Sequence, residues 1–241
     1  MFKFKDKTST EMKIIVEEEE HFIAKAPQRF EKNEIDGRDG AIFTELGYGI
    51  IERPIKVQIL DNSKLDDILG WLSGEGQFEY NNRVTTARFY NEIEPERKAT
   101  IKIAKFNFIR DPFWYKATDN YTTITTTVKN DGNISSRPII RLEKGEDESI
   151  DITIGEVRFT YTFPTGDTYV EIDCEEMEAK YNGLLRNRQL SIGYEFPLLP
   201  VGESTVTVHS GDATIKVKRK DRWLWLKYLM LMIEILEQTE T

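Results

Sequence analysis

Apolar and polar residues alternate along much of this chain. Ile55, Val57 and Ile59 are separated by polar residues, which is the period of two expected of a strand with one solvent-exposed face. Met12 to Val16 predicts a further strand, and the charged run Glu17 to Glu20 after it predicts an exposed segment. We therefore expect the first part of the chain to consist mainly of half-exposed strands.

One helix interrupts these strands. Ser63 is the expected N-cap, the acidic pair that follows it favours the positive end of a helix, and Gly74 is the expected stop. The apolar residues at helical spacing are Leu65, Ile68, Leu69 and Leu72. The pattern predicts a helix over about residues 64–73.

The alternation changes in the last strand of this region. The large apolar residues Ile101 and Ile103 are at odd-numbered positions, whereas Phe106 and Phe108 are at even-numbered positions. Because strand side chains alternate with a period of two, the change predicts a β-bulge or a sharp bend. A proline followed by three aromatic residues then ends the region, since proline is poorly tolerated inside a central strand. We place a domain boundary near residue 120, so that the first domain is residues 1–120.

Short alternating strands fill residues 121–220. Turn residues such as Asn130-Asp131-Gly132-Asn133 and Pro164-Thr165-Gly166-Asp167 separate them. About seven or eight short strands in such a length are typical of a two-sheet sandwich or jelly roll. The 26 Ile, 10 Val and 22 Thr residues far outnumber the 9 Ala, and β-branched residues favour strands. The expected fold class is therefore mainly β, with a β-sandwich-like first domain containing one α-helix and a second β-sandwich domain.

Residues 221–241 form an apolar C-terminal segment. Apolar residues run from Trp223 to Leu236 with two charged interruptions, and the run predicts a helix. Fourteen helical residues span about 21 Å, short of the roughly 30 Å hydrocarbon core, so we do not interpret the segment as membrane-spanning. A helix that is apolar all round packs on its own domain, contacts a neighbouring subunit or lies in an interface. The candidate docking residues are Trp223, Leu226, Leu229 and Ile233.

Charge and cysteine content narrow the classes of function. The net charge of −9 and the pI of about 5.0 have the wrong sign for binding nucleic acid or anionic lipid through a basic face. The single cysteine, Cys174, cannot form an intrachain disulfide and is expected to be a buried apolar residue of a strand. No apolar signal segment follows Met1, so we expect synthesis in a reducing cytoplasm.

Residues suited to catalysis or metal binding are few. The two histidines, His21 and His209, have no second ligand at helical or turn spacing, whereas a zinc site needs three or four converging ligands. The glycines between residues 37 and 49 lack the Gly-Lys-Ser/Thr ending of a phosphate loop, and no Gly-x-Ser-x-Gly elbow occurs. The sequence predicts no enzyme, no cofactor and no metal site.

Several motifs nevertheless occur in a recognisable order. The motifs of the first domain are Phe2-Lys3-Phe4 before Met12-Lys13-Ile14, Ile35-Asp36-Gly37-Arg38-Asp39-Gly40 followed by Tyr48 and Arg53, Trp71-Leu72-Ser73-Gly74, and Phe106-Asn107-Phe108 before Asp111-Pro112-Phe113-Trp114-Tyr115. The later motifs are Asn130-Asp131-Gly132-Asn133, Ser136-Arg137-Pro138-Ile139-Ile140 and Phe196-Pro197-Leu198-Leu199-Pro200-Val201-Gly202-Glu203. In order and spacing they resemble the distal tail protein (Dit) family of long, non-contractile-tailed phages, over about residues 1–220.

This resemblance implies a structural protein of the virion. Dit proteins form a ring, usually a hexamer, at the distal end of the tail tube, and the ring joins the tube to the tail fibre or baseplate hub around a channel for DNA. The resemblance implies that the first domain builds the ring, and that residues 121–220 are a galectin-like sandwich facing outward. The implied partners are further copies of the chain, the tail tube protein, the tail fibre or tail-associated lysin, the tape-measure protein and a receptor-binding protein.

A loop motif is the candidate site of ring assembly. Its residues are Gly37, Arg38, Asp39, Gly40, Tyr48 and Arg53. Tight turns at the two Asp-Gly steps would present Arg38, and an arginine at a subunit seam can take a bidentate carboxylate partner from the neighbour. In the alternative interpretation, Arg38 pairs within its own chain and only fixes the loop.

A carbohydrate-binding module that contacts host cell-wall glycans is the main alternative function. Such a site needs an exposed aromatic platform with polar neighbours. The candidate platform residues are Tyr161, Tyr169, Tyr181 and Tyr194, of which strand parity places at least half in the core.

Overall fold

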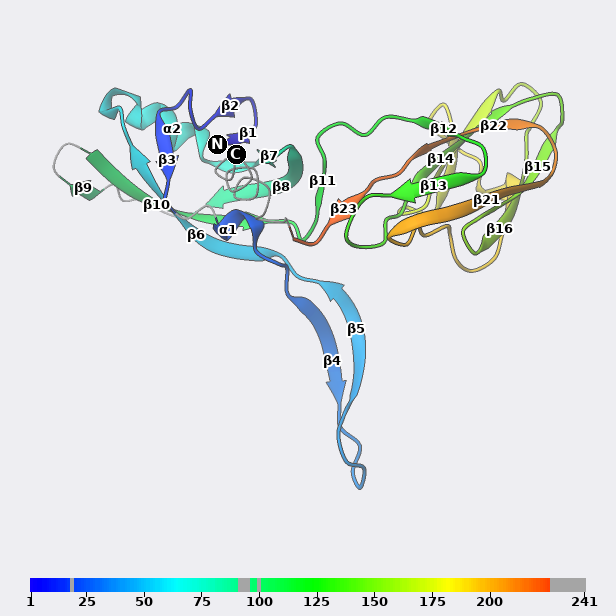
Figure 1. Ribbon diagram of the computed structural model, residues 1–241, viewed down its shortest axis with the longest axis horizontal. Coiled ribbons are helices and arrows are strands. Elements are labelled where there is room, and N and C mark those ends of the chain that lie inside the picture. The colour runs from blue at the N-terminus through cyan, green and yellow to red at the C-terminus, as the bar shows by residue number, and fades with distance from the viewer. Residues whose placement is uncertain (18–19, 91–95, 99–100, 226–241) are drawn as a thin grey trace, which may run out of the picture. The chain divides into compact units, whose positions relative to one another are not determined.

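The structure, a computed structural model, describes residues 1–17, 20–90, 96–98 and 101–225. The chain divides into two compact units, which are drawn in Figure 1. Unit 1 comprises Met1–Ala117 and Leu224–Thr241, and unit 2 comprises Thr118–Trp223. Strands make up most of both units, which confirms the mainly β fold class.

An antiparallel sheet forms the body of unit 1. Its strands lie in the order β2-β1-β7-β8-β10-β6-β3, with β9 beside β10 and β11 beside β8. The bounds are β1 Phe2–Phe4, β2 Lys7–Thr8, β3 Ile14–Val16, β6 Ile51–Ile59, β7 Gly74–Tyr80, β8 Arg83–Tyr90, β9 Glu96–Lys98, β10 Ile101–Arg110 and β11 Trp114–Lys116.

The core of unit 1 lies on one face of this sheet, against two short helices. α1 (Glu20–Ile23) buries Phe22, and α2 (Leu65–Trp71) buries Ile68 and Trp71. The Nε1 of Trp71 donates a 2.8 Å hydrogen bond to the backbone oxygen of Phe4, which holds α2 on β1. The aromatic residues that meet in this core are Phe2, Phe4, Phe22, Phe78, Phe89 and Phe108. Aromatic contacts of this kind bury large areas and fix the side chains around them.

The predicted helix exists, but its first turn differs from the expectation. A 3₁₀ turn, η1 (Asn62–Lys64), precedes α2, and the side chain of Asp61 accepts hydrogen bonds from both the backbone N and the Oγ of Ser63. Asp61 is therefore the capping residue, and the assignment of Ser63 as N-cap was wrong. The carboxylate can accept two hydrogen bonds at once, whereas the Ser63 hydroxyl lies inside the turn.

The predicted bulge between Ile103 and Phe106 is absent. β10 pairs with β6 without a register shift from Lys102 to Arg110. Ala104 is the buried residue at this point, so the buried positions alternate regularly along β10 from Ala104 through Phe106 to Phe108. Ile103 lies on the opposite face and is partly exposed. The prediction was wrong because a small buried alanine was overlooked beside a large, half-exposed isoleucine.

Two stacked sheets form unit 2. One sheet has the order β12-β22-β14-β17-β18-β19 and the other the order β13-β21-β15-β16-β20. The bounds are β12 Thr122–Ile124, β13 Thr127–Asn130, β14 Ile139–Lys144, β15 Ser149–Ile154, β16 Val157–Thr162, β17 Tyr169–Asp173, β18 Glu178–Tyr181, β19 Leu184–Leu185, β20 Leu190–Ile192, β21 Gly202–Ser210, β22 Ala213–Lys218 and β23 Arg222–Trp223, with the 3₁₀ turn η2 at Asn187–Gln189. Their inner faces share one apolar core, which includes Cys174. This is the expected two-sheet sandwich.

The apolar C-terminal segment lies mostly outside the described residues. Its predicted helix begins at Trp223, but Trp223 belongs to the short strand β23, so the helix prediction was wrong at its start. The candidate docking residues Leu226, Leu229 and Ile233 lie beyond the last described residue, Trp225. Leu224 is buried in unit 1.

Candidate functional site

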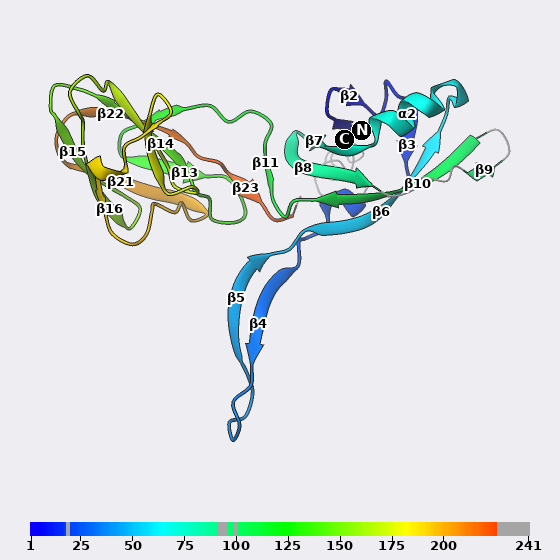
Figure 2. The ribbon, with the colours of Figure 1, turned by 180° about the vertical axis from the view of Figure 1, so that it is seen from behind.

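A two-stranded hairpin of unit 1 is the candidate functional site. β4 (Gln28–Asn33) and β5 (Ile42–Tyr48) pair with each other in a sheet of their own. Every residue from Gln28 to Asn33 is exposed, as is every residue of β5 before Tyr48. Figure 2 shows the hairpin from behind, protruding from the body of unit 1. The hairpin thus offers both its faces and its two long edges to a partner.

The exposed residues of this hairpin include several large apolar ones. The exposed fractions are 55% for Phe30, 58% for Phe43 and 51% for Leu46. Ile35, Ile42 and Ile50 are exposed as well. A two-stranded hairpin alone is at best marginally stable in water, and grouped exposed apolar residues mark interaction sites. We infer that the hairpin is a docking element.

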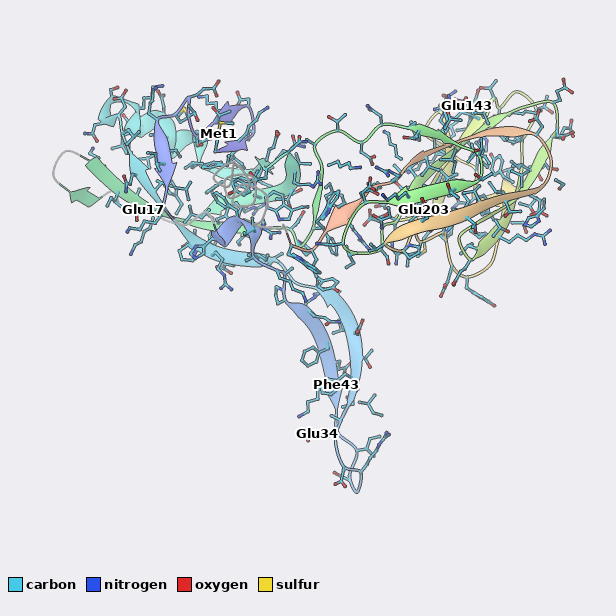
Figure 3. The ribbon with its side chains drawn as sticks, viewed as in Figure 1. Met1, Glu17, Glu34, Phe43, Glu143 and Glu203 are labelled. Carbon is cyan, nitrogen blue, oxygen red and sulfur yellow. The ribbon has the colours of Figure 1, made fainter. Side chains whose placement is uncertain are left out.

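The strand register divides these side chains between two faces. Phe30 is opposite Glu45 and Lys32 is opposite Phe43, so the four share one side, which we call the aromatic face. The rings of Phe30 and Phe43 meet edge to face, with centroids 5.3 Å apart. Figure 3 labels Phe43 on the shaft of the hairpin.

The opposite side, which we call the aliphatic face, is formed by Ile42, Thr44 and Leu46 of β5. Thr44 is opposite Glu31 and Ile42 is opposite Asn33. The two apolar side chains are therefore bordered by polar ones, which is the usual composition of a docking surface that must also remain soluble.

The root of the hairpin is tied to unit 1. The backbone N of Gly49 donates to the oxygen of Pro27 at 2.8 Å, closing the base of the two strands. The ring of Tyr48 meets that of Phe113 edge to face at 5.6 Å. Tyr48 and Phe113 also pack on a small buried cluster of Ala26, Ile51 and Leu224. The root is therefore a fixed point from which the exposed strands extend.

The predicted loop motif is spread over the whole length of this hairpin. Gly37, Arg38, Asp39 and Gly40 lie in the turn between β4 and β5, and Gly37 and Gly40 have φ of +79° and +83°. Tyr48 lies at the root, and Arg53 lies on β6 beyond it. The structure therefore separates the motif into a tip group and a root group. Sequence reasoning missed the strands between them.

Arg38 lies in the turn at the tip of the hairpin. Its backbone N donates to the oxygen of Ile35 at 3.1 Å, which helps to close the turn. Within the described part of the chain, its guanidinium forms no ion pair or side-chain hydrogen bond. The alternative in which Arg38 pairs within its own chain therefore has no support from this geometry.

The four candidate tyrosines of unit 2 do not form one exposed platform. Tyr161 is fully buried, and burial raises the pKa of its hydroxyl to about 12. Tyr169 and Tyr181 meet edge to face at 5.0 Å, and the Arg141 guanidinium covers the Tyr169 ring at 3.7 Å. Tyr194 is fully exposed.

A shallow hollow of about 490 Å³ lies near β19 in unit 2. It is lined by Pro164, Leu185, Arg186, Asn187, Arg188 and Gln189. Arg186 is held by the buried carboxylate of Asp167, with 2.6 Å between Nε and Oδ2, so it is not free to bind a ligand.

Residues with catalytic or metal-binding potential are not brought together. Across residues 1–17, 20–90, 96–98 and 101–225, no group of three or more His, Cys, Asp or Glu side chains could hold a metal ion. His209 Nε2 is 2.7 Å from the Thr153 hydroxyl, and His21 Nδ1 is 2.7 Å from the Pro54 oxygen. Cys174 is buried, and desolvation raises the pKa of its thiol. No helix in the part of the chain that the structure describes is long and apolar enough to span a membrane.

Comparison with known proteins identifies the second unit. Residues 131–223 match the family model described as "Siphovirus-type tail component, C-terminal domain". No curated protein matches the chain. Among solved structures, the Dit protein (gp 19.1) of phage SPP1 matches with a TM-score of 0.70 and 14% identity, over 90% of this chain and 96% of that one. The activated baseplate of phage P2 with Ca matches at a TM-score of 0.38 and 9% identity, over 89% of this chain and 93% of that one.

Residues 131–223 are therefore a siphovirus-type tail component domain. The family model covers most of unit 2, and the fold of the chain is that of SPP1 Dit. The resemblance seen in the motifs is supported by the family match over residues 131–223 and by the shared fold of the whole chain. The expected location at the virion tail agrees with this domain match.

Proposed function

We propose that copies of this protein assemble into a ring of six at the distal end of the tail tube. The ring would surround a channel for DNA and act as the hub that joins the tube to the tail fibre or baseplate. SPP1 Dit, the structure with the same fold, is described as a paradigm of the hub adsorption apparatus in phages that infect Gram-positive bacteria. The similarity supports the hub role, and the hairpin supports self-assembly.

The observation that carries the proposal is the exposure of the β4–β5 hairpin. Full burial of a large apolar side chain contributes about 1.5 to 3 kcal/mol, so burying the exposed half of one contributes about 1 kcal/mol. The six exposed apolar residues of the hairpin region would together contribute on the order of 5 kcal/mol before the cost of ordering the interface. This is enough for a specific contact between subunits when other contacts add to it.

The form of the contact favours a closed ring. Each chain has one such hairpin, and its surface differs from that of the sheet from which it extends. A contact between the hairpin of one copy and the body of the next is heterologous when it repeats in one direction, and heterologous contacts close into rings when the rotation between copies permits. Arg38 at the tip then has the position of an arginine at a subunit seam, with an acidic chain of net charge −9 to supply its partner.

The remaining partners follow from the hub role. We propose that the ring contacts the tail tube protein and the tape-measure protein on the tube side, and the tail fibre or tail-associated lysin on the distal side. Unit 2, a two-sheet sandwich, would serve as the platform for a receptor-binding protein.

The oligomeric state tests this proposal directly. Light scattering at several concentrations should give a mass near six times the chain mass of 28.1 kDa, with a ring visible by electron microscopy. Ile42→Lys, on the aliphatic face, should shift the protein toward monomer without lowering its unfolding temperature. Val208→Lys is the matched control, because Ile42 and Val208 are both 43% exposed and both lie on strands.

Two outcomes would contradict the proposal. A monomer at all concentrations, in the presence of purified tail tube as well as alone, would exclude a ring. An Ile42→Lys variant that keeps the wild-type mass would show that the hairpin does not carry assembly.

A further inference from the structure

The side chains of the aromatic face are arranged in a pattern that is complementary to itself. Phe30 and Glu45 form one cross-strand pair, and Lys32 and Phe43 form the next pair on the same side. The two phenylalanines therefore occupy one diagonal of a group of four side chains, and the two charged residues occupy the other. The rings meet along their diagonal, with centroids 5.3 Å apart. An apolar diagonal is thus crossed by a charged one.

All four side chains are accessible to a partner. Phe30 and Phe43 are each more than half exposed. The Lys32 ammonium forms an ion pair with Glu34, in which the two side chains are 52% and 69% exposed. Exposed pairs contribute little to stability, so this one leaves Lys32 able to take a second carboxylate. Within the part of the chain that the structure describes, Glu45 forms no ion pair or side-chain hydrogen bond.

A two-fold axis along the apolar diagonal makes this group of four match a second copy of itself. A half-turn about that line lays each phenylalanine against the same residue of the second copy. It also brings Lys32 of each copy over Glu45 of the other. An axis along the charged diagonal would instead oppose like charges. An axis along or across the strands would place a carboxylate against the negative face of a phenylalanine ring.

We propose that the aromatic face is a contact between two copies of this protein, related by the two-fold axis along the apolar diagonal. With a strand spacing of about 4.8 Å and a rise of about 6.8 Å over two residues, the diagonal lies about 35° from the strands. The strands of the two hairpins would then cross at about 70°, which is near the orthogonal class of sheet packing.

One chain supplies both kinds of complementarity that this contact needs. Ring against ring removes exposed apolar area from water, and two Lys32–Glu45 pairs border the rings. A purely apolar partner would leave both charges without a counterpart, and a purely charged one would leave the rings against charges. The face is small, so we expect a weak contact of the class that buries less than about 1,200 Å².

This contact is separate from the proposed ring. It is isologous, so two copies complete it, whereas the ring contact is heterologous and repeats around the ring. It also uses the aromatic face, whereas the ring contact is assigned to the aliphatic face. The inference therefore does not rest on ring assembly.

Zero-length crosslinking measures the charged pair directly. A carbodiimide joins a lysine to a carboxylate only when the two side chains are in contact. It is applied to a mixture of isotopically heavy and light full-length chains. We expect Lys32–Glu45 crosslinks that join a heavy peptide to a light one. Crosslinks confined to single chains would overturn the inference.

Charge reversal tests the symmetry of the contact. A benzophenone amino acid replaces Phe43, which lies on the proposed axis, and the yield of covalent dimer after irradiation is measured. Lys32→Glu and Glu45→Lys should each lower the yield on the order of tenfold, because each opposes like charges twice in one contact. An equimolar mixture of the two variants should restore the yield, since each charge then meets its opposite. Glu31→Lys, on the other side of β4, is the control and should leave the yield unchanged.

The mixture also separates this contact from its alternatives. If Lys32→Glu with Glu45→Lys in one chain restored the yield and the mixture did not, the two charges would act within a chain and the inference would be wrong. Absence of covalent dimer from position 43 at every concentration would also contradict it. These yields do not report the mass of the assembly, so failure of the proposed ring and failure of this contact are distinguishable.

Discussion

Arg110 offers a sharp test of how the root of the hairpin is held. Its side chain, at the end of β10, is fully buried. Nη2 donates to the oxygen of Ala24 at 2.6 Å, Nη1 donates to the oxygen of Asp111 at 2.8 Å, and the guanidinium covers the Trp114 ring at 4.8 Å. Ala24 lies four residues before β4, so this guanidinium links the central strand to the segment that enters the hairpin.

Burying the positive charge of Arg110 lowers the free energy of unfolding. Burial lowers the pKa of the guanidinium from 12.5 to about 9, and nearby Asp111 offsets only part of this effect. At 1.36 kcal/mol per pKa unit, the fall corresponds to roughly 5 kcal/mol. Because the folded-state pKa lies below the unfolded value, this cost is present in full below about pH 9 and is relieved as the pH rises above it. The hydrogen bonds and the stacking on Trp114 must offset it at neutral pH.

Arg110→Lys keeps the buried charge but removes much of this compensation. An ammonium cannot stack as a plane, and its single nitrogen cannot reach both carbonyl oxygens as the two Nη atoms do. Losing one hydrogen bond to a charged group costs about 1.5 to 3 kcal/mol, and the cation–π contact is worth up to about 2 kcal/mol when desolvated. We therefore expect the free energy of unfolding to fall by about 2 to 4 kcal/mol.

Urea unfolding followed by tryptophan fluorescence measures this change, because Trp71 and Trp114 are both buried in unit 1. Arg53→Lys is the control, since Arg53 lies on the neighbouring strand β6 with an exposed side chain. Its free energy of unfolding should change by less than about 0.5 kcal/mol. An Arg110→Lys variant as stable as Arg53→Lys would refute the reasoning about the buried guanidinium.

Three further substitutions test particular backbone and capping features. Gly211→Ala should lower the free energy of unfolding by about 2 to 4 kcal/mol in urea titrations, because φ is +87° and the new Cβ would lie 2.0 Å from the Ser149 oxygen. Gly183→Ala, where φ is +78° and no atom lies within 4 Å, should cost only about 1 kcal/mol. Asp61→Ala should lower the urea midpoint at neutral pH. Hydrogen bonds from the side chain and backbone of Ser63 lower the pKa of the Asp61 carboxyl, so the difference should shrink as the pH falls through 3.8 and below.

Periodicity predicted those parts of the fold in which burial separates two faces of an element. Ile55, Val57 and Ile59 alternate because one side of β6 is in the core, and all three are buried. Ile68 and Leu72 of the predicted helical face are buried for the same reason. In β10, by contrast, the large side chain of Ile103 was wrongly assigned to the buried face. The buried position is held by Ala104, and Ile103 is on the exposed side.

The strands of the hairpin gave no usable signal. Phe30 and Phe43 lie on one face and Ile42 and Leu46 on the other, so neither face is polar. Alternation identifies a strand only when one of its faces is solvent-exposed and the other is buried, and in the isolated chain neither face of the hairpin is buried. The Asp-Gly steps did point to a turn at residues 36–40. Sequence reasoning therefore found the tip and missed the strands that carry it.

The absence of a polar face has a further consequence for how the hairpin is used. A ribbon with apolar side chains on both sides needs two covers, and one partner laid along one face supplies only one. Under the proposed function, a neighbouring copy covers the aliphatic face. Ile42→Lys should then shift the protein toward monomer and leave the edge-to-face contact of Phe30 and Phe43 on the aromatic face in place, because the two faces depend on different side chains.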